Sequence, residues 1–212
     1  MIRCIAFVTL FLAAFRTPGA SAQTDSGIPG WRWRADKPAA DTAAAFDQMA
    51  PGWHMTSKSA GLLYPAGERA TGSFSHVADF VVFPETTDSG FGIFLGGADL
   101  EGSAGTYVAA LLRRDGAFSV ISRAGGSESV LVPWTRHSAV KAHPGTGTVT
   151  NRLRINASVD SLRIFVNDSS VARIKLGNAR TNGHFGFRVG ERVNLHLTIL
   201  DLIRHLAPAR SR

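Results

Sequence analysis

The chain is almost free of cysteine, since its 212 residues include only Cys4. A folded domain made by the remaining residues has no intrachain disulfide and depends on its apolar core for stability. A long apolar run is also missing. The longest, residues 4–15, is shorter than the roughly 20 residues that a transmembrane helix needs. We therefore expect no membrane span.

Several catalytic motifs are absent as well. The sequence has no His-Glu-x-x-His pair and no Gly-x-Ser-x-Gly elbow, which argues against zinc proteases and α/β-hydrolases. The stretch Gly145–Thr148 lacks the lysine and helix that a phosphate-binding loop requires. No metal site and no cofactor are expected from these patterns, apart from a calcium alternative considered below.

The distribution of charge argues against a nucleic-acid-binding protein. The formal net charge is +7, but the basic residues are scattered and form no dense run. Nucleic-acid-binding proteins usually carry a clustered basic stripe or a known motif, so we expect no nucleic-acid partner. The excess of positive charge predicts only a mild attraction to anionic polymers or to the cell envelope.

The first 22 residues have the three parts of a secretory signal peptide. Arg3 gives a basic start, residues 4–15 form the apolar part, and Ala20-Ser21-Ala22 has the small residues of a cleavage site. We expect a mature chain that begins near Gln23. Together with the lack of cysteine, this indicates a secreted or periplasmic bacterial protein.

The rest of the chain is predicted to be one domain. Residues 23–52 are expected to form an N-terminal lead-in, in which the Ala-rich stretch Ala39–Met49 allows a short helix. From residue 53 to 206 the pattern is that of β-structure. Short runs alternate apolar and polar residues and end in Gly, Asn, Asp or Ser. We expect strands at 53–57, 60–64, 69–83, 90–96, 105–114, 117–123, 128–132, 150–158, 161–167, 171–176, 183–189 and 193–203.

The turns and the side-chain alternation agree with this interpretation. Asp115-Gly116 between two alternating runs is a strong hairpin signal, and Asn167-Asp168 tolerates a positive φ. A dozen short strands without intervening helices predict an all-β antiparallel two-sheet jelly-roll sandwich. The residues expected to point into its core are Leu153, Ile155, Ala157, Leu162, Ile164, Val166, Phe185, Phe187 and Val189.

Five segments of the chain also resemble a known family. They are GFGIFLGGADLEG at 90–102, TYVAALLRRDGAFSVISR at 106–123, VLVPWTRHSAV at 130–140, and the strand-rich stretches 150–172 and 183–202. Together they resemble the concanavalin A-like lectin/glucanase (laminin-G-like) jelly roll of uncharacterised secreted bacterial proteins. The resemblance spans about residues 53–204 and implies the fold.

What the resemblance implies about function is broader, because this fold carries lectins, adhesion modules and enzymes. The glucanase members carry Glu-x-Asp-x-x-Glu or Glu-x-Asp-x-Glu on one strand, and the nearest acidic cluster here, Asp99-Leu100-Glu101, lacks the leading glutamate. We therefore expect a secreted non-catalytic carbohydrate-binding or adhesion module whose partner is a carbohydrate or cell-envelope glycan. The alternatives are a glycoside hydrolase or polysaccharide lyase of the same fold, and a structural envelope protein.

Asp99 and Glu101 are the first candidate site residues. They lie two apart in a Gly-rich segment, so on a strand both would face one side. Three interpretations stay open: carboxylate ligands for Ca²⁺, a glycosidase pair, or a polar turn.

Trp134 and Tyr107 are the best candidates for sugar platforms, because an aromatic face packs against the C–H face of a sugar ring. Either ring could instead belong to the core. His137, close in sequence to Trp134, is a candidate for a polar sugar contact. Arg113 is expected on a strand face and would suit an acidic sugar if that face is concave.

Overall fold

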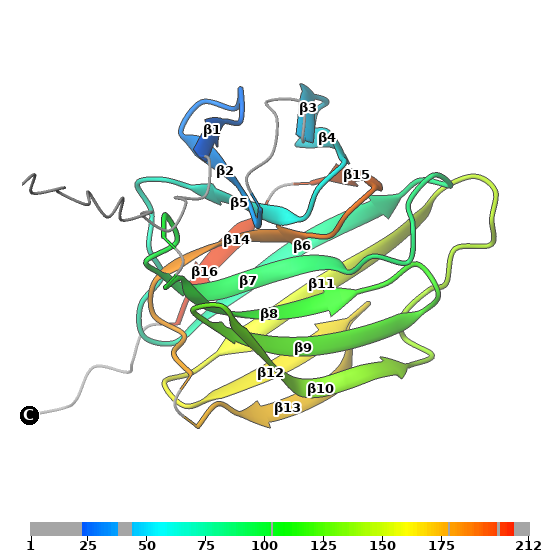
Figure 1. Ribbon diagram of the computed structural model, residues 1–212. Helices are drawn as coiled ribbons and strands as arrows, with labels where there is room; N and C mark the ends of the chain where they lie inside the picture. Colours follow the sequence, from blue (N-terminus) through cyan, green and yellow to red (C-terminus); the bar gives the residue numbers. More distant parts are fainter. Residues whose placement is uncertain (1–22, 38–43, 103, 178, 199, 206–212) are drawn as a thin grey trace, which may run out of the picture.

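The computed structural model describes residues 23–37, 44–102, 104–177, 179–198 and 200–205 (Figure 1). The expected signal peptide, residues 1–22, lies outside the described residues. Within them the structure is entirely β, and no helix is long and apolar enough to cross a bilayer.

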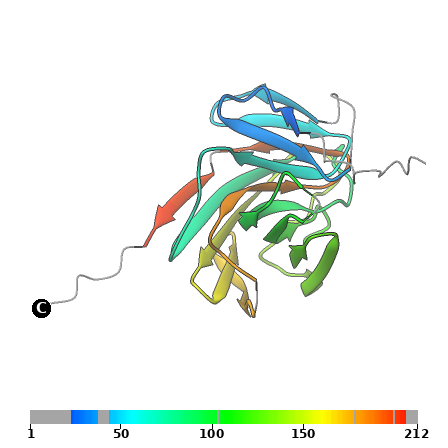
Figure 2. The ribbon, with the colours of Figure 1, turned by 60° about the vertical axis from the view of Figure 1, so that its left-hand side comes forward.

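The strands form two antiparallel sheets that pack face to face. The front sheet has the order β1-β2-β5-β14-β7-β8-β9-β10, and the back sheet has the order β13-β12-β11-β6-β15-β4-β3 with β16 also on β6. Figure 1 looks onto β7–β10 of the front sheet, and Figure 2 shows the two layers from the side. The jelly-roll sandwich expected from the sequence is therefore confirmed.

The front sheet consists of β1 (Gln23–Asp25), β2 (Trp31–Ala35), β5 (Gly61–Pro65), β14 (His184–Val189), β7 (Phe91–Ala98), β8 (Thr106–Leu112), β9 (Ala117–Ala124) and β10 (Ser127–Arg136). The back sheet consists of β13 (Ser169–Lys175), β12 (Ser161–Val166), β11 (Val149–Ala157), β6 (Phe74–Val82), β15 (Val193–Leu197), β4 (Trp53–Ser57), β3 (Ala44–Gln48) and β16 (Asp201–Arg204).

The core lies between the sheets and contains the predicted inward residues. Leu153, Ile155, Leu162, Ile164 and Val166 of the back sheet are at most 1% exposed. They are joined by Ala157 and, from the front sheet, by Phe185, Phe187 and Val189. Each buried large side chain contributes about 1.5–3 kcal/mol, so this set is a substantial part of the stabilising core.

The predicted turns are also found. Gly116 has a φ of +86° in the turn from β8 to β9, a conformation that glycine adopts without strain. Asn167 and Asp168 have φ values of +47° and +65° between β12 and β13, as a two-residue hairpin of the primed type requires. These turns fix the register of the strands that they join.

Two expectations about the ends of the domain are wrong. The short helix that the Ala-rich stretch Ala39–Met49 allows is not present at 44–48, which form β3; residues 38–43 lie outside the described residues. Phe46 pairs with Met55 of β4 and packs edge-on against Trp33, so pairing at a sheet edge overrides the helix propensity of alanine. The lead-in 23–52 therefore contributes strands to both sheets.

The single strand expected at 193–203 is divided. β15 pairs with the second half of β6, through Leu195–Val82, and β16 pairs with its first half, through Leu202–His76. Both segments have the alternation of a strand, and the break between them is not visible in that pattern.

Candidate functional site

The outer face of the front sheet, which points away from the core, carries a second apolar cluster. It contains Leu62, Tyr64, Phe94, Leu100, Tyr107, Ala109, Leu111 and Ile121, each at most 7% exposed. In a two-layer sandwich the outer face of each sheet is normally polar and solvated. An apolar outer face must therefore be covered by other parts of the chain or by a partner. In β7 and β8 nearly every residue on both faces is buried.

Charged side chains from distant parts of the chain gather on this face. Arg188 of β14 donates a hydrogen bond of 2.6 Å to Asp36 and two of 3.0 Å to the carbonyl groups of Gly61 and Val189. Arg123 of β9 lies 3.7 Å from the same carboxylate. The Asp36 carboxylate and the Arg188 guanidinium are only 16% and 11% exposed. Removal of Asp36 would leave Arg188 buried without its anion, which is costly.

A depression of about 490 Å³, the first depression, lies on the β2–β5–β14 side of the connection between β7 and β8. Its lining is Arg32, Tyr64, Ala66, Arg69, Asp99, Leu100, Glu101, Gly102, Ala104 and His184. The ring of His184 lies 5.5 Å from that of Tyr64. Burial, reinforced by Arg69, lowers the pKa of His184, so at neutral pH this ring is uncharged.

Asp99 and Glu101 both lie in the turn that forms a wall of the first depression. Asp99 has a φ of +51°, and its carbonyl accepts a hydrogen bond of 3.2 Å from the amide of Gly102. Glu101 pairs with Arg32 at 2.7 Å, and the carbonyl of Gly102 accepts a hydrogen bond from Arg34. The turn is thus tied to β2. Among the described residues, no three His, Cys, Asp or Glu side chains are grouped as metal ligands.

Tyr107 lies on the other side of the β7–β8 connection, in a second depression of about 410 Å³. Its ring is 2% exposed and packs against Phe94 at 5.7 Å. Burial raises the pKa of Tyr107, and Arg188 opposes this shift, so the phenol is protonated at neutral pH.

Trp134 and Arg113 lie at the opposite end of β8 from Tyr107. The indole is 40% exposed and lies over Gly90, where a Cβ atom would approach it to 2.9 Å. The guanidinium of Arg113 is 4.9 Å from the ring centroid and donates to Asp115 at 2.9 Å, which lowers the pKa of Asp115. Leu111, next to the indole, is four residues from Tyr107, about 13 Å along an extended strand. Trp134 and Tyr107 therefore belong to different parts of the face.

His137 follows β10 and contacts the core instead of Trp134. Its ring meets Phe118 edge-on at 6.2 Å, and its Nδ1 accepts a hydrogen bond of 3.1 Å from the amide of Ala139. This arrangement orders the turn after β10.

Several residues of the two depressions were not expected from the sequence. They are Arg32, Tyr64, Arg69, His184, Arg123 and Arg180. The one sequence signal for a covered outer face was the run 91–97, in which the residues of both faces are apolar or glycine. Such a strand must be covered on each side.

No family model matches the chain, and no curated protein matches its sequence. Solved structures do match. The carbohydrate binding module CBM66 from Bacillus subtilis superimposes with a TM-score of 0.62 at 12% identity, over 85% of this chain and 99% of that one. A Bacillus subtilis protein of unknown function with a galectin-like fold gives 0.64 at 10% identity, over 89% and 99%. The exoplasmic/lumenal domain of VIP36, in a Ca²⁺- and mannose-bound form, gives 0.59 at 12% identity, over 88% of each chain. At these identities the chain shares a fold with proteins of the lectin type, which is the jelly roll that the sequence predicted.

Proposed function

We propose that this protein is a non-catalytic carbohydrate-binding module and that the first depression is its sugar site. The observation that supports this proposal is the mixed lining of the depression. Hydrogen-bond donors, hydrogen-bond acceptors and rings from β2, β5, β14 and the Asp99–Glu101 turn converge there. The likeness of the fold to CBM66 and to the mannose-bound VIP36 domain agrees with it.

The chemistry of the lining suits a sugar. Sugar hydroxyl groups both donate and accept hydrogen bonds, and Arg69 offers donors while Asp99 offers carboxylate acceptors. The rings of Tyr64 and His184 provide an apolar wall for the C–H groups of a sugar. Tyr64 and His184 stand on strands and Asp99 on a tied turn, so little ordering of these three groups is needed on binding.

The Arg69→Ala variant tests this site. Arg69 is exposed, so its loss should change stability by less than about 0.5 kcal/mol. A glycan array first identifies a ligand for the wild-type protein. Calorimetry should then show affinity about tenfold lower in the variant, as expected for a lost charge-assisted hydrogen bond. Lys141→Ala, which removes an exposed cation outside the depression, should bind like the wild type.

The Trp134→Ala variant distinguishes a sugar site at the first depression from one at the exposed indole, at the other end of the outer face of the front sheet. If it loses binding without a fall in melting temperature while Arg69→Ala binds normally, the sugar lies at the exposed indole and our placement is wrong. If the wild-type protein retains no glycan, the proposed function is wrong. Release of reducing ends from a bound glycan would instead favour the hydrolase alternative.

We also propose that the protein is secreted, because residues 1–22 have the three parts of a signal peptide. In a bacterial host, N-terminal sequencing of the exported protein should begin near Gln23. Recovery of a chain that still carries Met1 would contradict this.

A further inference from the structure

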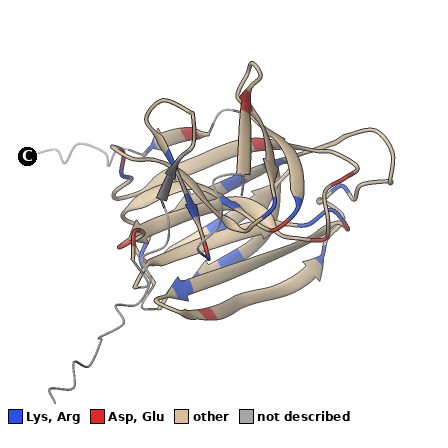
Figure 3. Ribbon diagram, turned by 45° about the horizontal axis from the view of Figure 1, so that its top comes forward, with Lys and Arg blue, Asp and Glu red and all other residues tan. Residues whose placement is uncertain are grey.

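The second depression differs from the first in its charge. It is lined by Gly96, Ala98, Thr106, Tyr107, Val108, Ser122, Arg123, Ala124, Ala179, Arg180 and Asn182. No carboxylate is among these residues, whereas the first depression has Asp99 and Glu101 beside its arginines. Arg123 turns its guanidinium to the outer face of the sheet, where it lies 3.7 Å from Asp36, so the cation of the second depression is Arg180. Across the fold as a whole Lys and Arg are interspersed with Asp and Glu (Figure 3), so a cavity lined by one sign of charge is a local feature.

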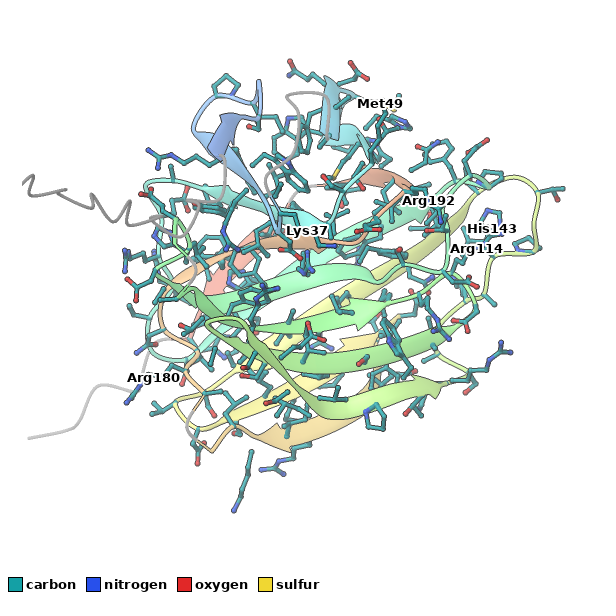
Figure 4. The ribbon with its side chains drawn as sticks, in the orientation of Figure 1. Lys37, Met49, Arg114, His143, Arg180 and Arg192 are labelled. Atoms are coloured by element: carbon teal, nitrogen blue, oxygen red, sulfur yellow. The ribbon has the colours of Figure 1, made fainter. Side chains whose placement is uncertain are left out.

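Arg180 has an available guanidinium group. It is exposed, and in the part of the chain that the structure describes it makes no ion pair. Figure 4 shows its side chain extending outward from the connection between β13 and β14. It also lines an adjacent depression of about 390 Å³. Arg123, by contrast, donates to the carbonyl of Gly125 at 3.3 Å and lies near Asp36.

The backbone that carries Arg180 is held on both sides. The carbonyl of Arg180 would lie 1.9 Å from a Cβ atom at Gly96, whose φ is +68°, so the two backbones touch. The hydroxyl of Thr181 donates to the carbonyl of Ser158 at 3.1 Å. Gly183 exchanges backbone hydrogen bonds of 2.9 and 3.0 Å with Ala70. These contacts anchor the segment that carries Arg180 against β7, Ser158 and Ala70.

Neutral hydrogen-bonding groups line the second depression together with Arg180. Thr106 and Ser122 line the depression with hydroxyl side chains. The Oδ1 of Asn182 accepts a hydrogen bond from the amide of Gly72 at 2.9 Å, which leaves its amino group as a donor. A ligand that fits this lining carries an anionic group together with hydroxyl groups.

We propose that the second depression binds the uronate unit of an acidic glycan, with the carboxylate of the sugar on Arg180. The proposal rests on the proposed carbohydrate-binding function and adds the class of sugar. The planar guanidinium matches a carboxylate through two parallel hydrogen bonds, and the hydroxyl and amide groups match the sugar ring.

The test uses oligogalacturonate, oligoglucuronate and oligomannuronate, each beside its methyl ester, which keeps the hydroxyl groups and removes the charge. We expect the wild-type protein to bind at least one free acid about tenfold or more tightly than its ester, since a charge-assisted pair is lost on esterification. Arg180→Ala should abolish this preference and leave the binding of the ester unchanged. Arg180→Lys should restore part of it, and added salt should weaken the free acid selectively.

The matched control is Arg173→Ala, which removes an exposed arginine from β13, the edge strand of the back sheet. It should keep the wild-type preference for the acid. The inference is overturned if acids and esters bind equally, or if Arg180→Ala retains the preference. In either case binding of the esters or of neutral glycans still supports the proposed function, whereas a protein that binds none of these sugars contradicts both proposals.

Discussion

We expect Ile164→Asp to unfold the domain and Arg163→Asp to leave it folded, although the two positions are adjacent on β12. Ile164 is 1% exposed and lies between Ile155 of β11 and Ala172 of β13. An unpaired carboxylate at this site costs several kcal/mol, which is comparable with the roughly 5–15 kcal/mol of stability that a domain has. Arg163 is exposed on the outer face, where a substitution usually costs less than about 0.5 kcal/mol.

Circular dichroism and thermal melting of the two variants check this expectation. Arg163 lies 5.3 Å from the ring of Phe165, so its replacement also removes a weak cation–π contact, and a small fall in melting temperature is expected. Ile164→Val serves as the conservative control and should cost about 0.5–1.5 kcal/mol. Similar melting temperatures for the two aspartate variants would show that the two faces of β12 are assigned wrongly.

Strands β11 and β12 of the back sheet were predictable because each buries only one face. In Ser161–Val166, Leu162, Ile164 and Val166 recur at every second position and are buried, while the residues between them are not, so the alternation gives the strand and its orientation. The same reasoning located the turns at Gly116 and Asn167, where the backbone needs a positive φ. Local chemistry determines these features, and a single sequence contains it.

The candidate site was not predictable to the same degree, because contacts between distant segments make it. Asp36 meets Arg188 across 152 positions of sequence, and Arg32 meets Glu101 across 69. No periodicity in either segment reports such a pair. Closeness in sequence was also misleading for His137, which contacts Phe118 of the core although Trp134 is three residues away.

Acidification should destabilise the protein through His76, the buried histidine of β6. His76 is 0% exposed and lies between the rings of Phe74 and Phe185, with centroid distances of 5.1 and 4.4 Å. Burial lowers its pKa to about 4, and a contact with the backbone of Asp201 opposes this shift only in part. The imidazole is therefore neutral in the folded protein throughout the physiological range.

The direction of the pH effect follows from the two pKa values. In the unfolded chain His76 takes up a proton below about pH 6.5, whereas in the folded protein it does so only near pH 4. Between these values the unfolded state binds more protons, so the free energy of unfolding falls as the pH falls. The shift of about 2.5 pKa units corresponds to a loss of about 3 kcal/mol, complete near pH 4.

Urea unfolding of the wild type and of His76→Phe at pH 7 and pH 4.5 measures this loss. The phenylalanine stays between the same two rings and cannot titrate, so the variant should lose about 2–3 kcal/mol less than the wild type on acidification. Phe185→Leu is the packing control. It should lower stability by a similar amount at both pH values, because it changes the contact with His76 without removing the titrating group. An equal acid sensitivity of wild type and His76→Phe would mean that another group causes the destabilisation and that His76 is not held neutral by burial.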